Sequence, residues 1–191
     1  GCRLTTAFRG LVDRAGLKPG EWLAIHGCGG VGLSAVMIGQ ALGAQVLAVD
    51  INEEALAMAR KLGANATLNP SAVPDAALAV RDMTGGGAHV SIDGLGITAT
   101  IQNSLRSLRK LGRHVQIGQP LGKHAAPPVP LLETVYARQI SIFGTRGIAA
   151  SRFSALLGMI AGGRLDPARM ITKRIALSEA CLLYTSDAAD D

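Results

Sequence analysis

The feature that most constrains the fold is the segment GCGGVG at residues 27–32, which has the glycine spacing G-x-G-x-x-G. It follows an apolar run at residues 21–26 that is typical of a β-strand, and a helical pattern of apolar residues comes directly after it. In this context Gly27 permits a tight turn, Gly29 lets backbone N–H groups approach a pyrophosphate, and Gly32 lets the helix pack closely on the sheet. The segment therefore predicts a strand–turn–helix unit that binds a dinucleotide. A P-loop is excluded because no Gly-Lys-Ser/Thr follows.

An acidic residue supports the same interpretation. Asp50 ends the second apolar run, 18 residues after Gly32, where a carboxylate can hydrogen-bond the adenosine ribose hydroxyls. The 2′-phosphate of NADP would meet that carboxylate, and two like charges about 4 Å apart repel by about 4 kcal/mol at an effective dielectric of about 20. Neither Ile51 nor Asn52 supplies an arginine to relieve the repulsion. The sequence therefore favours NAD over NADP.

The rest of the chain alternates apolar strand-like runs with helical patterns. The expected strands are residues 21–26, 45–50, 66–68, 89–93, 113–117 and 139–143. The expected helices are residues 31–42, 52–62, 74–83, 98–108 and 151–161, with Asn52 and Ser151 as N-caps of the second and the last. This alternation predicts an α/β fold of the Rossmann type, a doubly wound parallel sheet of six strands in the order 3-2-1-4-5-6 with helices on both faces.

Composition excludes several other classes of protein. Hydrophobic residues make up 48% of the 191 residues and charged residues 17%, which indicates a globular chain. The net charge of +5 comes from scattered Lys and Arg, and three Phe, two Tyr and one Trp are too few for a base-stacking surface, so we expect no nucleic-acid partner. No apolar run has the length of a membrane span, so no membrane partner is expected. The three cysteines are too widely spaced for a disulfide framework, which favours a cytoplasmic location.

Beyond the glycine segment, the sequence resembles the zinc-dependent medium-chain alcohol dehydrogenases. The resemblance runs from Gly1 to about Ala180. Its most specific parts are GCRLTTAF at residues 1–8, KPGE at 18–21, HGCGGVGLSAV at 26–36, AVDI at 48–51 and KLGA at 61–64. It implies NAD and zinc as cofactors, and an alcohol or aldehyde as the substrate of a hydride transfer.

The resemblance also assigns expected roles to individual residues. It implies that Cys2 is the last of three protein ligands to a catalytic zinc, that Thr6 lies beside the nicotinamide, and that Val31 packs behind the ring. Leu95 would form a wall of the adenosine-side cleft. Main-chain groups at Ile117, Ser141 and Phe143 would hold the carboxamide. The complete set of expected cofactor-binding residues is Thr6, Gly27, Gly29, Gly30, Val31, Gly32, Asp50, Leu95, Ile117, Ser141 and Phe143, and the expected metal ligand is Cys2.

The same resemblance suggests a domain organisation. Residues 1–10 would belong to the junction with a catalytic domain, 11–150 to the NAD-binding domain, and 151–180 to the return toward the catalytic domain. Residues 181–191 depart from the family and are expected to be disordered. The family's other zinc ligands and its proton relay belong to the catalytic domain, so we expect no turnover by this chain alone. The apolar edge strand, residues 139–144, is expected to pair in a homo-oligomer.

Other functions stay open at this point. A non-catalytic Rossmann domain that senses NAD(H) would share the glycine segment, but it would need neither Cys2 nor Thr6. A zinc-free quinone reductase is disfavoured by Cys2 and Asp50. A methyltransferase would bind an S-adenosyl cofactor and would have no use for a nicotinamide pocket.

Overall fold

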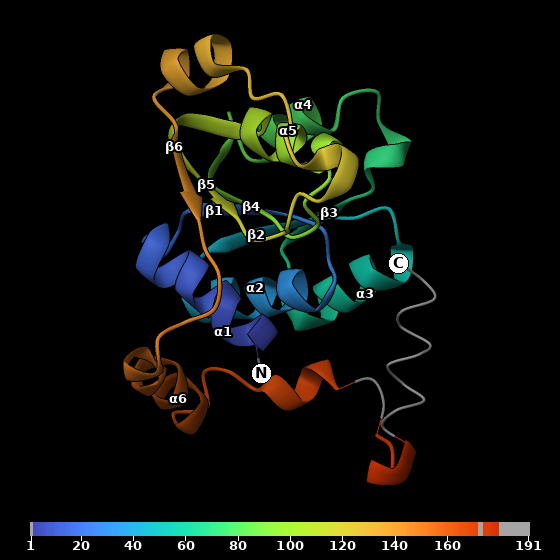
Figure 1. The fold of residues 1–191 in the computed structure, drawn as a ribbon, viewed down its shortest axis with the longest axis vertical. Helices are drawn as coiled ribbons and strands as arrows, with labels where there is room; N and C mark the ends of the chain where they lie inside the picture. The colour runs from blue at the N-terminus through green and yellow to red at the C-terminus, as the bar shows by residue number, and fades with distance from the viewer. Residues whose placement is uncertain (1, 172–173, 180–191) are drawn as a thin grey trace.

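The computed structural model describes residues 2–171 and 174–179, and its centre is a parallel six-stranded sheet in the order β3-β2-β1-β4-β5-β6 (Figure 1). The strands are β1 (Trp22–His26), β2 (Gln45–Val49), β3 (Ala66–Leu68), β4 (Ala88–Asp93), β5 (Leu108–Gln116) and β6 (Ser141–Gly144). The predicted fold class and strand order are confirmed. All strands are parallel, but the order in which the chain adds them reverses between β1 and β4. Clefts for ligands form at such points, beside the carboxyl ends of the strands.

Helices cover both faces of the sheet (Figure 1). The α-helices are α1 (Cys2–Phe8), α2 (Gly30–Ala41), α3 (Glu53–Leu62), α4 (Ala76–Met83), α5 (Thr98–Arg106) and α6 (Phe153–Ala161). Wider, π-helical turns occur at Arg9–Arg14 and Leu131–Tyr136, and tighter 3-10 turns at Pro70–Ala72, Gly122–His124, Ala150–Arg152, Pro167–Met170 and Leu177–Glu179. Figure 1 shows α1, α2 and α3 on one face and α4 and α5 on the other.

The central strands are buried on both faces, as a doubly covered parallel sheet requires. On the face of α2, the side chains of Ile25 and Ile38 belong to one apolar core. On the opposite face, Leu47, Val80 and Leu108 form a second one. Each of these five side chains is fully removed from solvent, so the hydrophobic effect fixes α2 and the strands that frame the glycine turn.

Helix ends follow the expected chemistry at α3. The Asn52 side chain accepts hydrogen bonds from the backbone N–H groups of Glu54 and Ala55, which confirms it as the N-cap. The helix ends at Gly63, whose φ of +110° a glycine adopts without strain. The cap at Asn52 begins α3 directly after Asp50, so the carboxylate lies in a well-defined turn.

Three local expectations were wrong. Helix α5 ends at Arg106 and β5 begins at Leu108, because Leu108 pairs with Ala88 and a bulge follows in the ladder. Strand β6 begins at Ser141, two residues later than expected, because Gln139 adopts a left-handed φ of +53°, outside the extended region of a regular strand. Ser151 does not cap α6, which starts at Phe153 with no side-chain cap.

The N-terminal residues form more structure than the sequence predicted. Helix α1 and the π-helical turn Arg9–Arg14 lie against α2, and Leu4, Ala7 and Phe8 are buried in the same core as the sheet. Residues 2–8 are therefore an integral part of the packed domain. The disorder expected for residues 181–191 falls outside the described part of the chain. Within that part, no helix is long and apolar enough to cross a membrane.

Candidate functional site

The glycine turn joins β1 to α2, and at two of its positions a side chain would clash with neighbouring atoms. Gly27 has a φ of +95°, and a Cβ there would lie 2.7 Å from Cγ of Leu95. At Gly32 a Cβ would overlap the carbonyl oxygen of Gly27 and lie 2.9 Å from its carbonyl carbon. The third glycine thus allows the first turn of α2 to touch the end of β1, which is the close helix–strand packing that the spacing predicted.

In front of α2 the turn leaves room for a ligand. A Cβ built on Gly29 would meet no atom within 4 Å, so the space beside this residue is open. Gly29 is the N-cap of α2, and no side chain caps the helix. The first N–H groups of an α-helix have no partners within the helix, and its dipole places partial positive charge at this end. This open helix terminus fits a pyrophosphate group.

Asp50 is fixed beside the turn by two backbone donors. Its Oδ2 accepts a hydrogen bond from the N–H of Cys28 at 2.6 Å, and its Oδ1 accepts one from the N–H of Asn52 at 2.9 Å. A carboxylate has about four acceptor positions, so both oxygens can still accept hydrogen bonds from a ribose diol. The neighbouring Ile51 is exposed and carries no charge that could attract a 2′-phosphate.

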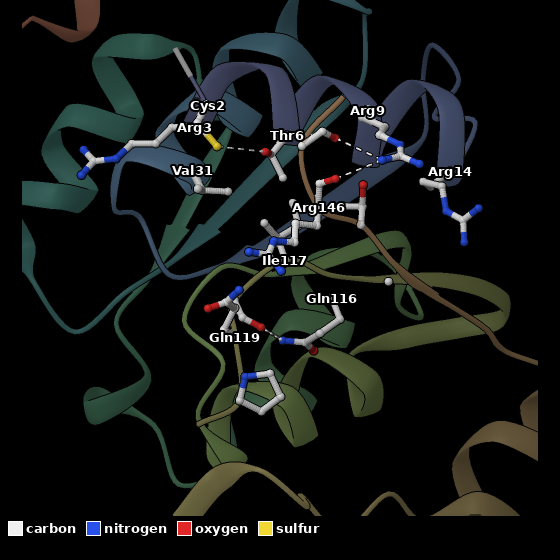
Figure 2. Close-up of a pocket in the computed structure, with 15 residues that line it drawn as sticks. Cys2, Arg3, Thr6, Arg9, Arg14, Val31, Gln116, Ile117, Gln119 and Arg146 are labelled. Carbon is white, nitrogen blue, oxygen red and sulfur yellow. Dashed lines mark hydrogen bonds between the residues drawn. The ribbon is translucent and has the colours of Figure 1, made fainter. Parts of the chain in front are cut away.

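A cleft of about 820 Å³ opens at the carboxyl ends of β5 and β6 (Figure 2). One wall is formed by α1 and the turn after it, together with Val31 of α2, and the opposite wall by the segments that follow β5 and β6. The residues that line it are Cys2, Arg3, Thr6, Arg9, Arg14, Val31, Gln116, Ile117, Gly118, Gln119, Pro120, Gly144, Thr145, Arg146 and Gly147. The cleft adjoins the glycine turn through Val31, so one elongated ligand can reach both.

Four of the residues predicted around the nicotinamide come together in this cleft, namely Cys2, Thr6, Val31 and Ile117. Leu95 lies against Gly27 on the other side of the glycine turn, where its side chain is half exposed. The structure thus groups four of these five positions in the cleft and places Leu95 against the glycine turn.

Ser141 and Phe143 are not brought into the cleft. Ser141 pairs with Arg113 at the start of β6, near the amino ends of the strands, whereas the cleft lies at the carboxyl ends. The residue beside Ile117 is instead Thr145, whose N–H donates to the carbonyl of Gln116 at 3.1 Å. The late start of β6 explains this difference, since the residues that reach the cleft are Gly144–Gly147.

A buried network that the sequence analysis missed supports the lower wall of the cleft. The side chain of Asp93, fully buried at the end of β4, accepts a hydrogen bond from the N–H of Gly96 at 2.9 Å and another from Nε2 of Gln116. Gln116 Oε1 in turn accepts from Nε2–H of His114 at 3.0 Å, and Gln116 Nε2 also donates to the carbonyl of Gly118. A carboxylate at the end of a buried strand is the only local signal of this network. These bonds hold the segment 116–118 that lines the cleft.

The described residues do not form a metal site by themselves. Cys2 is exposed, and its Sγ lies 3.7 Å from the hydroxyl of Thr6. In residues 2–171 and 174–179, no three His, Cys, Asp or Glu side chains are grouped closely enough to hold a metal ion. A catalytic zinc needs three protein ligands, so this part of the chain does not fit one alone. Cys28 is no candidate either, because burial and the neighbouring Asp50 carboxylate raise the pKa of its thiol to about 12.

Fold and cleft together define a Rossmann-type α/β domain with a ligand cleft beside its switch point. The family model described as zinc-binding dehydrogenase matches residues 30–162. The chain therefore belongs to the zinc-dependent medium-chain dehydrogenase family, as its sequence pattern indicated.

Individual relatives agree with this membership. The chain is 36% identical over 134 residues to an alcohol dehydrogenase of Geobacillus stearothermophilus, a match that covers 70% of this chain and 38% of the relative. It is 32% identical over 181 residues to geraniol dehydrogenase of Castellaniella defragrans, covering 94% of this chain and 44% of the relative. The chain thus spans less than half the length of these curated relatives.

Solved structures show the same relationship. The alcohol dehydrogenase TADH from Thermus sp. ATN1 superposes with a TM-score of 0.89 at 30% identity, over 100% of this chain and 55% of that one. A structure described as an NAD-dependent alcohol dehydrogenase superposes with a TM-score of 0.77 at 30% identity, over 87% of this chain and 48% of that one. Family and relatives support NAD and zinc as the cofactors.

Proposed function

We propose that this chain is the NAD(H)-binding part of an oxidoreductase that transfers a hydride between an alcohol and NAD. The observation that carries the proposal is the Asp50 carboxylate, which two backbone N–H groups hold beside an open glycine turn. When bound, NAD supplies the acceptor or donor of the hydride. The protein's contribution is to bind the cofactor, to orient it and to select it.

Each part of the glycine turn has a distinct task in this proposal. The free N–H groups at the start of α2 hold the pyrophosphate, and the open space at Gly29 lets it approach the backbone. Asp50 accepts hydrogen bonds from the adenosine ribose, and Leu95 forms the wall next to Gly27. The same carboxylate selects against NADP, because a 2′-phosphate would bring a second negative charge to it.

At the other end of the cofactor, the cleft receives the nicotinamide. Val31 and Ile117 provide apolar surface on opposite walls, and Thr6 offers a hydroxyl close to Cys2. Because the relatives are an alcohol dehydrogenase and a geraniol dehydrogenase, we propose an alcohol, or the matching aldehyde, as the substrate. We assign Cys2 as one ligand of a zinc ion whose other ligands the described residues do not supply.

The proposed cofactor-binding domain comprises residues 11–150, with residues 1–10 and 151–180 as its connections to a catalytic domain. In this arrangement α1 has two roles. It packs on α2 through Leu4 and Phe8, and it places Cys2 and Thr6 at the rim of the cleft where a catalytic domain would meet the nicotinamide.

We also propose that two copies pair through the outer edge of β6. Among the described residues this strand is the last one in the sheet, so no described strand neighbours its outer backbone groups. Ile142 is 45% exposed there, and Leu131, Leu132 and Tyr136 of the preceding π-helical turn are exposed as well. An apolar edge strand favours association, and pairing of identical edges gives a two-fold symmetric contact.

The proposal is tested by titrating the full chain with NADH and with NADPH, followed by the cofactor's fluorescence. We expect NADH to bind at least about tenfold more tightly, since half of the calculated charge repulsion already gives that ratio. Asp50→Asn should reduce the preference, whereas Asp82→Asn, an equal charge change on the exposed side of α4, should not. Oxidation of ethanol and benzyl alcohol is assayed in parallel, and steady turnover is not expected from this chain alone. Failure to bind NADH, or equal binding of NADPH, would refute the proposal.

A further inference from the structure

Arg3 lies at the meeting point of the cleft and the glycine turn. It is in the first turn of α1, whose residues Leu4 and Phe8 are buried against the domain core, so the backbone beside Arg3 is firmly placed. The Arg3 side chain itself is exposed and lines the cleft together with Val31. Figure 2 shows its guanidinium group extending past Val31, away from Cys2 and Thr6.

The side chain of Arg3 passes directly over Gly30, the first residue of α2. A Cβ built on Gly30 would lie 2.7 Å from Nη1 and 3.0 Å from Nε of Arg3, and it would overlap the Arg3 stem. The guanidinium therefore rests on the glycine turn because residue 30 has no side chain. This places a full positive charge at the same helix end where the backbone N–H groups of α2 are unpaired.

No acidic side chain neutralises this charge. Within the described part of the chain, Arg3 takes part in none of the ion pairs and donates none of the side-chain hydrogen bonds. The residues lining the cleft include four arginines and neither Asp nor Glu. Two of the other arginines have partners elsewhere: Arg9 donates to the carbonyls of Arg146 and Gly147, and Arg14 lies over the ring of Phe143.

We propose that Arg3 is a further cofactor-binding residue, whose guanidinium contacts the pyrophosphate of NAD(H) beside the N-terminus of α2, where the side chain already lies over Gly30. The inference rests on the proposed function, since it requires a dinucleotide at the turn. A pyrophosphate carries two negative charges, and the N-terminus of α2 supplies only partial positive charge. Arginine presents a planar fork of N–H donors that matches phosphate oxygens, and it stays charged at any pH of interest. The positive charge of Arg3 thus adds to the partial positive charge at the N-terminus of α2, and together they offset the negative charge of the pyrophosphate.

Fragments of the cofactor show which of its parts Arg3 contacts. The affinities of the full chain for NADH, ADP-ribose and adenosine are measured for the wild type, Arg3→Met and Arg3→Lys. ADP-ribose contains the pyrophosphate without the nicotinamide, and adenosine contains neither. Arg164→Met is the matched control, because Arg164 is an exposed arginine outside the cleft and loses the same charge.

We expect Arg3→Met to weaken NADH and ADP-ribose by about tenfold each, the usual size of one charged hydrogen bond, and to leave adenosine unchanged. Arg3→Lys should keep part of the affinity, since it keeps the charge and loses the fork. The wild-type affinity for ADP-ribose should fall with salt, and more steeply than that of Arg3→Met. Arg164→Met should bind all three ligands like the wild type.

Other outcomes overturn the inference in distinguishable ways. If Arg3→Met weakens NADH but not ADP-ribose, Arg3 acts at the nicotinamide end of the cleft. If both ligands bind unchanged, Arg3 has no part in cofactor binding, although the proposed function stands. A wild-type chain that binds neither NADH nor ADP-ribose removes the proposed function itself. Should Arg3→Met fail to fold, as judged by circular dichroism, Arg3→Lys together with the wild-type salt dependence decides the question.

Discussion

Replacing Gly32 with alanine tests whether the third glycine is required for packing. A Cβ at this position would overlap the carbonyl oxygen of Gly27 and lie 3.3 Å from Cγ2 of Ile25, which is fully buried. Both neighbours belong to or adjoin β1, a central strand, so neither can turn away as a flexible surface side chain would. The start of α2 must therefore move away from the strand by about 1 Å in a close-packed core.

The expected cost follows from two opposing effects. Overpacking of a close-packed core typically costs about 1–3 kcal/mol and sometimes more. Alanine gains about 1 kcal/mol over glycine inside a helix, but this gain is small near the first turn. The net free energy of unfolding should fall by about 2 kcal/mol. With a urea m-value of about 2 kcal/mol/M, the midpoint of unfolding should fall by about 1 M.

Gly29→Ala is the matched control for this change. A Cβ at Gly29 meets no atom within 4 Å, and its φ of −70° suits any residue, so the urea midpoint should stay close to that of the wild type. NADH binding should nevertheless weaken, because the methyl group would fill space in front of the helix terminus. Unfolding by urea is followed by far-UV circular dichroism and binding by NADH fluorescence. A Gly32→Ala variant as stable as the wild type would refute the packing argument.

Three further predictions concern the cofactor, the buried histidines and the sheet edge. Asp50→Ser combined with Ile51→Arg should shift the ratio of NADH to NADPH affinity by at least about tenfold toward NADPH, since repulsion is removed and a phosphate partner is added; an unchanged ratio would show that Asp50 is not at the ribose. Burial and the charge of His114 lower the pKa of His26 to about 3. The neutral His26 side chain therefore contributes its full stability above its unfolded pKa of about 6.5, and this stability is lost as the pH falls toward 3. The loss by pH 5 is roughly 2 kcal/mol, and His26→Gln should show a correspondingly flatter dependence of the urea midpoint on pH between 7 and 5; an equal slope in both proteins would contradict the assignment. Ile142→Lys should shift the mass measured by light scattering from dimer to monomer while NADH binding survives, and a wild-type chain that is already monomeric at tens of micromolar would rule out the interface.

The sequence predicted the fold well where the local conformational preferences of the residues agree with their tertiary contacts. The strand at Ala66–Leu68 was predicted with its observed bounds, and the cap at Asn52 was predicted because its side chain satisfies donors two and three residues away. The strand order followed from the glycine segment and the alternation of elements, since a doubly wound sheet has few permitted topologies.

Where prediction failed, pairing between distant residues decided the structure. Leu108 has the pattern of a helix end, but its pairing with Ala88 starts β5 there, and Leu111 adopts a φ of +60° within β5, where the register of the ladder shifts. The network of Asp93 and Gln116 arises because these residues are opposite each other on β4 and β5, a register that no local pattern reveals.

The cleft was predictable to a similar degree. Residues in or next to the glycine segment could be placed, because the motif itself fixes their geometry. Arg3 could not, since its position over Gly30 depends on how α1 packs against α2. Ser141 lies outside the cleft because it is the first residue of β6, and the start of that strand depends on the backbone of Gln139.

A backbone amide NMR titration of the full chain with NADH shows whether a dinucleotide binds across the glycine turn with its ribose at Asp50. We expect the largest chemical-shift changes at the amides of Gly29, Gly30 and Val31, and at that of Cys28, whose N–H donates to Asp50. Amides of α4, on the opposite face of the sheet, should stay unchanged. Changes that cluster at the amino ends of the strands, or no changes at saturating NADH, would show that the dinucleotide does not bind at the glycine turn.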